Sequence, residues 1–299
     1  MSLPALLQRF LTPKMPPMRE RSVQCIGLHG LHRMAYLEWG NPHNPRVLIC
    51  VHGLTRNARD FDFLAQALAA DYRVICPDVA GRGRSEWLQF SDDYALPLYV
   101  SDMVTLIARL NVDSVDWVGT SMGGLIGMLI AGQAGSPIRR MVLNDVGPLI
   151  TAASLQRIAE YVSKTPVFAG MEDAEKYIRT ICAPFGRLTD IQWRHMVVNG
   201  VRQRSDGQLE LSYDPAIAEP FRKSFLAVDV DLWPVYDLIR SPVLVLRGAF
   251  SDVLSADTLA QMAQRGPHAR TLEIPNVGHA PALMNQEQIA TVRAFLLDA

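Results

Sequence analysis

A serine lies between glycines in the segment Gly119-Thr120-Ser121-Met122-Gly123. An apolar run over 114–118 precedes it, and apolar residues at helical spacing over 125–134 follow it. This order is typical of a strand, a sharp turn and a helix, with the serine at the apex of the turn. Glycines two residues before and after the serine permit a close approach of strand and helix that Cβ atoms would obstruct. The pattern predicts a nucleophilic serine, although five residues alone are a weak signal.

A serine hydroxyl is a useful nucleophile near neutral pH only when a base accepts its proton. An imidazole suits this task because its unperturbed pKa is about 6.5, and Gly278-His279-Ala280-Pro281 follows the last expected strand. The imidazole in turn needs a carboxylate that fixes its tautomer. Asp252, in Arg247-Gly248-Ala249-Phe250-Ser251-Asp252, follows the preceding expected strand. Ser121, Asp252 and His279 are therefore the expected catalytic residues, in the chain order of a nucleophile-elbow triad.

Attack of a serine on an acyl group creates an oxyanion, which needs two preorganised hydrogen-bond donors. The backbone N–H of Met122, directly after the serine and at a helix N-terminus, is the first expected donor. The N–H of Leu54 is the second, because His52-Gly53-Leu54 follows the apolar strand expected over 47–51. We expect His52 to shape this oxyanion loop and not to act as the base.

The elements that must position these residues alternate between strand and helix up to about residue 148. The alternation predicts a mostly parallel α/β sheet with helices on both faces, so that the carboxyl ends of the strands meet at one crevice. Residues 21–28 and 31–39 predict a hairpin. The remaining expected strands cover 47–51, 72–76, 115–118, 141–143, 242–246 and 270–274, and the expected helices cover 58–70, 98–110, 256–264 and 287–297.

The alternation stops after residue 148. Helical patterns over 154–163, 174–181 and 191–198 are separated by polar stretches, and no strong buried strand pattern occurs among them. This segment is therefore expected to be a helical insertion. The expected organisation is a first part of the core over 1–148 with an irregular lead-in over 1–20, a helical cap over 149–231 and a second part of the core over 232–299.

The composition is that of an ordinary globular protein. The 299 residues are 49% hydrophobic and 20% charged, and the formal net charge of −1 offers no general attraction for nucleic acid or an anionic membrane. No apolar stretch approaches the ~20 residues that span a bilayer. The apolar run in residues 1–10 is short and lacks a basic leader, and the four cysteines show no CxxC spacing. These features predict a cytoplasmic protein with reduced thiols.

The four motifs around His52, Ser121, Asp252 and His279, in this order and each after an expected strand, resemble those of the α/β-hydrolase fold family. The resemblance runs from about residue 21 to the C-terminus. It implies an eight-stranded, mostly parallel sheet with a helical cap inserted after the sixth strand. It also implies a Ser-His-Asp hydrolase that uses no cofactor and no metal.

The carboxylate has alternatives within this resemblance. In the family the acid most often follows the strand that precedes Asp252, and some relatives place it one strand earlier, at the position of Asp145. Asp78 also follows an expected strand. We expect Asp252 to be the acid, with Asp145 as the first alternative.

The expected reaction is hydrolysis of a small carboxylic ester or related acyl substrate through an acyl-enzyme. The serine excludes the haloalkane dehalogenases and epoxide hydrolases, whose nucleophile is aspartate. Carbon–carbon hydrolases of ring-cleavage products usually have Asn before the serine and Trp after the histidine, where this chain has Thr120 and Ala280. Lactonases, acyltransferases and perhydrolases use the same triad, and non-catalytic small-molecule receptors of this fold retain it, so these alternatives stay open. Arg56, Arg82 and Arg84 could face an anionic substrate, but solvated positions are commoner for loop arginines.

Overall fold

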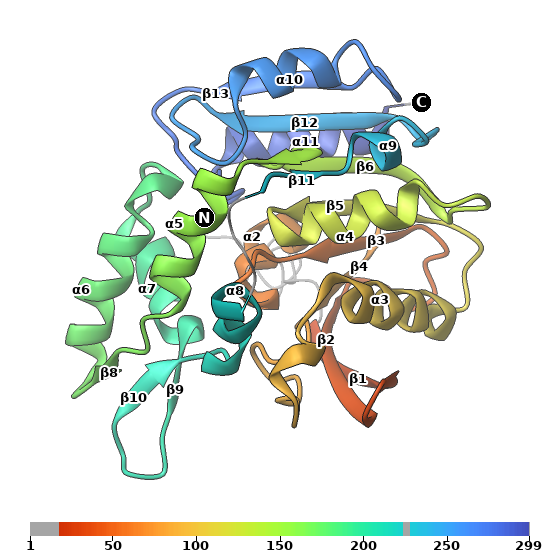
Figure 1. Ribbon diagram of the computed structural model, residues 1–299. Coiled ribbons are helices and arrows are strands. Elements are labelled where there is room, and N and C mark those ends of the chain that lie inside the picture. Colours follow the sequence, from red (N-terminus) through yellow and green to blue (C-terminus); the bar gives the residue numbers. More distant parts are fainter. Residues whose placement is uncertain (1–17, 224–227, 299) are drawn as a thin grey trace, which may run out of the picture.

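An eight-stranded sheet forms the centre of the molecule (Figure 1). The computed structural model describes residues 18–223 and 228–298. The sheet has the order β1-β2-β4-β3-β5-β6-β12-β13; β1 and β4 pair with β2 in the antiparallel sense and all other pairs are parallel. The mostly parallel sheet expected from the alternating pattern is thus confirmed. Its strands are β1 Met18–Gly27, β2 Gly30–Trp39, β3 Val47–Val51, β4 Arg73–Pro77, β5 Val115–Thr120, β6 Ile138–Asn144, β12 Val243–Gly248 and β13 Arg270–Ile274.

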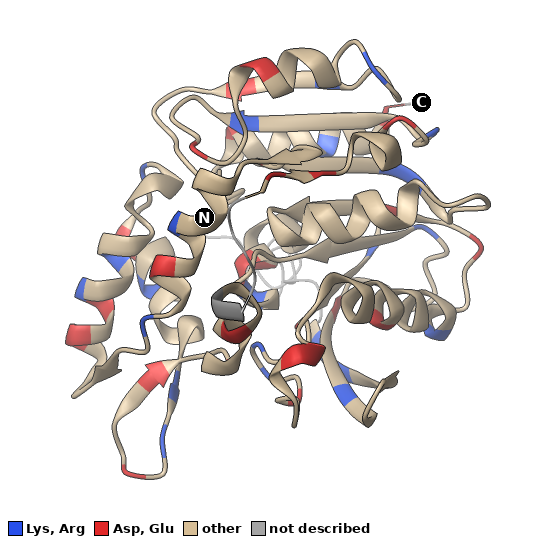
Figure 2. Ribbon diagram, in the orientation of Figure 1, with Lys and Arg blue, Asp and Glu red and all other residues tan. Residues whose placement is uncertain are grey.

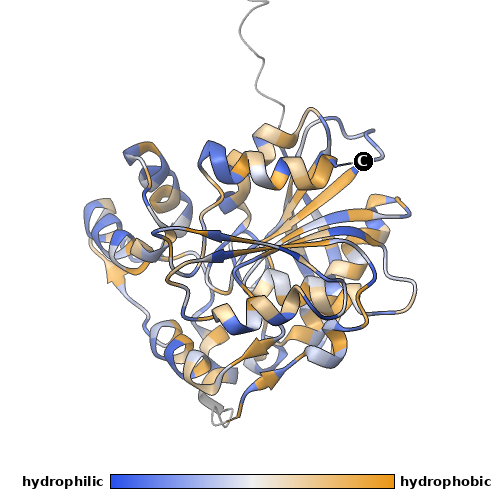
Figure 3. Ribbon diagram, turned by 90° about the horizontal axis from the view of Figure 1, so that it is seen from above, coloured by the Kyte–Doolittle hydropathy of each residue, from blue (hydrophilic) through white to orange (hydrophobic). Residues whose placement is uncertain are grey.

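Helices cover both faces of this sheet, which explains why its central strands are continuous apolar runs. Every residue of β3 and β12 is buried. One face packs against α3 (Leu96–Leu110), α4 (Met122–Ala131), α9 (Trp233–Tyr236) and α10 (Ala256–Met262). The other face packs against α2 (Asp62–Leu68) and α11 (Gln286–Leu297). Figure 3 shows the hydrophobic strands between these helical layers.

The segment between β6 and β12 leaves the sheet and returns to it at adjacent positions. The strands β7 (Leu149–Ile150) and β11 (Val230–Asp231) pair in the antiparallel sense, and the Leu232 N–H donates to the Pro148 carbonyl at 2.7 Å. Most of the segment lies to one side of the sheet in Figure 1. Its helices are α5 Ala152–Val162, α6 Met171–Ile181, α7 Asp190–Gly200 and α8 Glu219–Lys223. The division into core and cap at residues 148/149 and 231/232 stays a prediction.

The sequence led us to expect a helical segment here, but the segment also contains strands. A small antiparallel sheet of order β8-β10-β9 lies among the helices. Its strands, β8 Val167–Phe168, β9 Val201–Gln203 and β10 Leu209–Leu211, have only two or three residues each. Runs this short carry no readable alternation of apolar and polar residues.

The irregular lead-in expected over 1–20 lies mainly outside the described residues, but residues 18–20 already belong to β1. The expected helix over 58–70 divides into the 3₁₀ helix η1 (Ala58–Phe61) and α2. Short 3₁₀ turns also occur at η2 Ser91–Asp93, η3 Ala183–Phe185 and η4 Pro215–Ala218.

The surface carries charges of both signs. Figure 2 shows basic and acidic residues interspersed over the described elements, which fits the net charge of −1. Within the described ranges, no helix combines the length and the apolar character needed to cross a membrane.

Candidate active site

Ser121 lies at the junction of β5 and α4 in a conformation that few non-glycine residues adopt. Its φ and ψ are 51° and −116°, and such strained backbones are concentrated at functional sites. The flanking glycines are required sterically. A Cβ at Gly119 would lie 2.4 Å from the Gly123 carbonyl, and a Cβ at Gly123 would lie 2.0 Å from the Val51 oxygen. The turn therefore has the geometry expected from its sequence.

His279 lies in the loop between β13 and α11 and contacts the serine. Its Nε2 is 2.9 Å from Ser121 Oγ, and its Nδ1 is 2.7 Å from Asp145 Oδ2. The network assigns the ring proton to Nδ1, which donates to the carboxylate and leaves Nε2 to accept from the hydroxyl. The His279 side chain is 21% exposed. A substrate can therefore reach the imidazole.

The carboxylate beside His279 belongs to Asp145, which directly follows β6. Its side chain is fully buried. Burial of a carboxylate is costly unless hydrogen bonds compensate for the lost water. The Gly248 N–H donates to Oδ1 at 2.8 Å and the Ser251 hydroxyl donates to Oδ2 at 2.6 Å. Together with His279, these donors hold the carboxylate in one orientation.

The structure does not place Asp252, the acid expected from the sequence, beside His279. Its side chain is 54% exposed and pairs with Arg157 at 3.2 Å. The reason lies in the turn after β12, where Ser251 directs its hydroxyl at Asp145 and also accepts the Leu254 N–H at 3.1 Å. The next side chain, that of Asp252, is left at the surface. Asp145, the alternative from the sequence, takes the place beside the imidazole.

Asp78 is a buried carboxylate with other partners. It accepts the backbone N–H groups of Ala58 at 2.8 Å and Arg84 at 3.0 Å. Burial raises its pKa to about 6. It thus ties together the loops after β3 and β4.

His52 holds the oxyanion loop in place. It is fully buried; its Nδ1–H donates to the Gly53 carbonyl at 2.7 Å, and its Nε2 accepts the Val79 N–H at 2.9 Å. Burial is the main cause that lowers its pKa to about 4. Both ring nitrogens are occupied by backbone partners, which supports a structural role for this histidine.

The depressed pKa of His52 predicts a dependence of stability on pH. The unfolded chain binds the proton with a pKa of 6.5 and the native state with one of about 4. This contribution, about 3 kcal/mol, is fully present above pH 6.5 and is lost as the pH falls toward 4. In urea unfolding between pH 7.5 and 4, we expect His52→Gln to be less stable at pH 7.5 and to lose less stability on acidification than wild type. Equal pH slopes in the two proteins would contradict this, since Asp78 contributes equally to both.

The oxyanion loop lies against the serine. A Cβ built on Gly53 would be 3.7 Å from Ser121 Cβ. In the part of the chain that the structure describes, neither the Leu54 N–H nor the Met122 N–H donates to a protein acceptor. Neither N–H group is thus taken up by another acceptor among the described residues, and their role as oxyanion donors stays a prediction.

Arg82 supports this loop, which the sequence analysis did not foresee. It is buried; its Nε donates to the Leu54 carbonyl at 2.8 Å and its Nη1 to the Tyr99 hydroxyl at 2.9 Å. The flanking residues Gly81 and Gly83 have φ values of 82° and 54°, which favour glycine. These alternating glycines were the available signal that the arginine sits in a constrained turn.

Two cavities meet at Ser121 and share Leu54 and Tyr161. The larger, of about 390 Å³, has no charged residue among its described lining. The smaller, of about 260 Å³, includes His279 and Arg56 in its lining. The larger cavity is lined, among others, by Leu96, Met122, Leu125, Val146, Ile158 and Ile217. An acyl group and an alcohol group could thus occupy separate spaces on either side of the serine.

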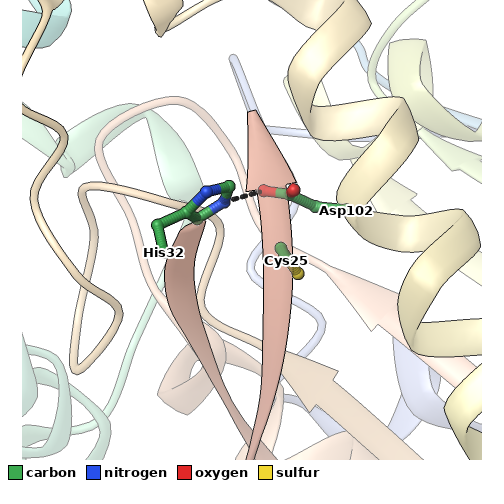
Figure 4. A group of neighbouring side chains, drawn as sticks. All are labelled: Cys25, His32 and Asp102. Carbon is green, nitrogen blue, oxygen red and sulfur yellow. Dashed lines mark hydrogen bonds and ion pairs between the residues drawn. The ribbon is translucent and has the colours of Figure 1, made fainter. Parts of the chain in front are cut away.

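One further group of described side chains is close enough to hold a metal ion. Cys25, His32 and Asp102 place their ligand atoms within 4.8 Å of one another (Figure 4). His32 Nε2 lies 2.9 Å from Asp102 Oδ2, and this hydrogen bond raises the pKa of His32. All three are buried between β1, β2 and α3. The hydrogen bond between His32 and Asp102 attaches the β1–β2 hairpin to α3. We assign no metal to this group of three residues.

The sheet is mostly parallel, and a serine, a histidine and a carboxylate form a hydrogen-bonded line at the carboxyl ends of its strands. This arrangement is typical of hydrolases with a nucleophile elbow. The model of the alpha/beta hydrolase family matches residues 48–292, and the chain belongs to this family. It is a hydrolase.

Individual relatives narrow the comparison. The chain is 53% identical over 284 residues to a 3-hydroxybutyrate-oligomer hydrolase of Cupriavidus necator, covering 93% of this chain and 97% of that protein. It is 25% identical over 237 residues to a 2-(acetamidomethylene)succinate hydrolase of Mesorhizobium japonicum, covering 78% and 81%. The crystal structure of an alpha/beta hydrolase from Novosphingobium aromaticivorans has a TM-score of 0.83 and 36% identity, covering 95% of this chain and 99% of that one.

Proposed function

We propose that this chain hydrolyses short oligoesters of 3-hydroxybutyrate with Ser121, His279 and Asp145 as the catalytic triad. The observation that carries the proposed chemistry is the unbroken line of two hydrogen bonds from Ser121 Oγ through His279 to Asp145. The substrate class is taken from the relative that is 53% identical over almost the whole chain.

In the proposed reaction, Ser121 Oγ attacks the ester carbonyl while His279 Nε2 accepts its proton. The N–H groups of Leu54 and Met122 bind the oxyanion; one such donor is worth about 10²–10³ in rate. The tetrahedral intermediate then collapses. The bond between the carbonyl carbon and the leaving oxygen breaks, and His279 passes its proton to that oxygen. A water, deprotonated by His279, releases the acyl group from the serine.

Asp145 supports both halves of this cycle without touching the substrate. Its carboxylate holds the Nδ1–H tautomer of His279 and stabilises the imidazolium that forms after proton transfer. The larger, apolar cavity fits an acyl group that exposes methyl and methylene hydrogens.

A panel of substrates tests this proposal. Purified enzyme is incubated with the dimer, trimer and tetramer of 3-hydroxybutyrate and with p-nitrophenyl esters of two to eight acyl carbons, with Ser121→Ala as the blank. We expect release of 3-hydroxybutyrate, measured by chromatography. Cleavage of the p-nitrophenyl esters alone would show an ester hydrolase with another substrate. No turnover, together with no labelling by a fluorophosphonate, would favour a receptor.

A further inference from the structure

Arg56 brings a positive charge into the smaller cavity, which also contains Ser121 and His279. Among the described residues that line this cavity, it is the only one with a guanidinium or ammonium group. Arg56 Cγ lies 4.0 Å, and Ser121 Cβ 3.7 Å, from the position that a Cβ on Gly53 would occupy. The arginine therefore lines the same cavity as the nucleophile. It is not a solvated loop residue, because its side chain is only 12% exposed.

Two hydrogen bonds hold the guanidinium of Arg56 in a fixed orientation and leave its Nη1 group without a hydrogen-bond partner among the described residues. Its Nε and Nη2 donate to the two Asp60 oxygens at 2.8 Å and 2.6 Å. None of the hydrogen bonds among the described residues uses Nη1, which lies 3.7 Å from the position of a Cβ on Gly200. Gly200 lines the same cavity. A fork fixed on one side by a carboxylate is preorganised to bind a second one on the other.

The chemistry of ester cleavage decides which part of a substrate meets this arginine. The leaving oxygen must receive its proton from His279 Nε2, so the leaving alcohol has to lie on the histidine side of the serine. His279 lines the smaller cavity with Arg56, whereas the described lining of the larger cavity contains neither. The alcohol half of the ester thus faces the guanidinium.

We propose, building on the proposed function, that Arg56 binds the free carboxylate of the hydroxy acid that leaves. Arg56 then selects for esters whose alcohol part carries a carboxylate close to the ester oxygen. In an oligomer of 3-hydroxybutyrate only the last unit at the carboxyl end has this property. The enzyme removes that unit as free hydroxy acid and keeps the rest of the chain on Ser121 until water releases it.

The test compares the 3-hydroxybutyrate dimer with its primary amide, which has the same ester bond and no charge at the carboxyl end. In Arg56→Gln, we expect the ratio of kcat/KM for the acid to that for the amide to fall about 10- to 100-fold. The value for the amide should fall less than the value for the acid, since the amide has no carboxylate for Arg56 to bind. Because the ratio is measured within each variant, a partly unfolded preparation does not alter it. Arg56→Lys, which keeps the charge, should retain part of the preference.

Arg59→Gln is the matched control. Arg59 lies on η1, pairs with Asp62 at 2.6 Å, and is absent from the described lining of both cavities. Its acid-to-amide ratio should equal that of wild type. An unchanged ratio in Arg56→Gln would overturn the assignment of Arg56 and leave the proposed function intact.

A second readout does not depend on cleavage of oligomers. Free 3-hydroxybutyrate should inhibit hydrolysis of p-nitrophenyl butyrate by wild type, and its inhibition constant should rise by the same 10- to 100-fold factor in Arg56→Gln. If wild type cleaves no oligomer but the inhibition constant still rises in Arg56→Gln, the proposed substrate is wrong and the carboxylate site is supported. If the inhibition constants agree, the site is refuted.

Discussion

Hydrolysis by Ser121→Ala is expected to be about 10⁶-fold slower in kcat than hydrolysis by wild type. The variant lacks the only atom that the proposed mechanism uses to attack the ester, while Gly119 and Gly123, which allow the turn, are unchanged. The loss is measured with the 3-hydroxybutyrate dimer and with p-nitrophenyl butyrate. Alanine is also expected to remove labelling by a fluorophosphonate, because no oxygen remains to bond to phosphorus.

Ser101→Ala is the matched control for this experiment. Ser101 is an exposed residue of α3, and its loss should change kcat less than twofold, within the range of a neutral surface substitution. Residual labelling of Ser121→Ala at the wild-type rate would show that another side chain is the nucleophile, and the proposed mechanism would fail.

The two candidate acids should separate by about four orders of magnitude. Asp145→Asn is expected to lower kcat about 10⁴-fold, because an amide nitrogen beside Nδ1 favours the tautomer in which Nε2 carries the proton and cannot accept another. Asp252→Asn, at an exposed ion pair with Arg157, should lower kcat less than threefold. Steady-state kinetics on one ester at constant pH measures both.

A stability control accompanies this pair, since Asp145 is buried and Asp252 is not. Thermal unfolding identifies any loss of folded protein. If Asp145→Asn does not fold, Ser251→Ala removes one donor to the same carboxylate and is expected to lower kcat about tenfold. A large loss in Asp252→Asn with full activity in Asp145→Asn would reverse the assignment of the acid.

Much of the site was readable from the sequence because its residues stand at the ends of apolar runs. The strand before Ser121 and the glycines around it define the turn, and His279 follows the last strand. Parallel strands bring such positions to one edge of the sheet irrespective of their distance in the sequence. That rule predicts which residues meet, but it does not predict the direction in which each side chain points.

The choice between Asp145 and Asp252 depended on such a direction. Both residues follow strands that are neighbours in the sheet, and the turn after β12 directs Ser251 inward and Asp252 outward. Composition and periodicity do not indicate which of two adjacent side chains in a turn faces the site. Arg82 was missed for a related reason, since its partners Leu54 and Tyr99 lie 28 and 17 residues away and make burial possible only in the folded chain.

The pairing of β7 with β11 has a consequence for how this enzyme can be re-engineered. Because residues 150 and 230 are bonded to one another, the stretch between them is an excursion whose two ends are already closed. Lengthening this segment costs little loop-closure entropy, about 0.6 kcal/mol for each doubling. We expect it to leave in place the strands that precede Ser121, Asp145 and His279. A replacement for this segment, taken from a related hydrolase, should therefore be joined at β7 and β11. The hydrogen bonds between these two short strands fix the distance between the two junctions.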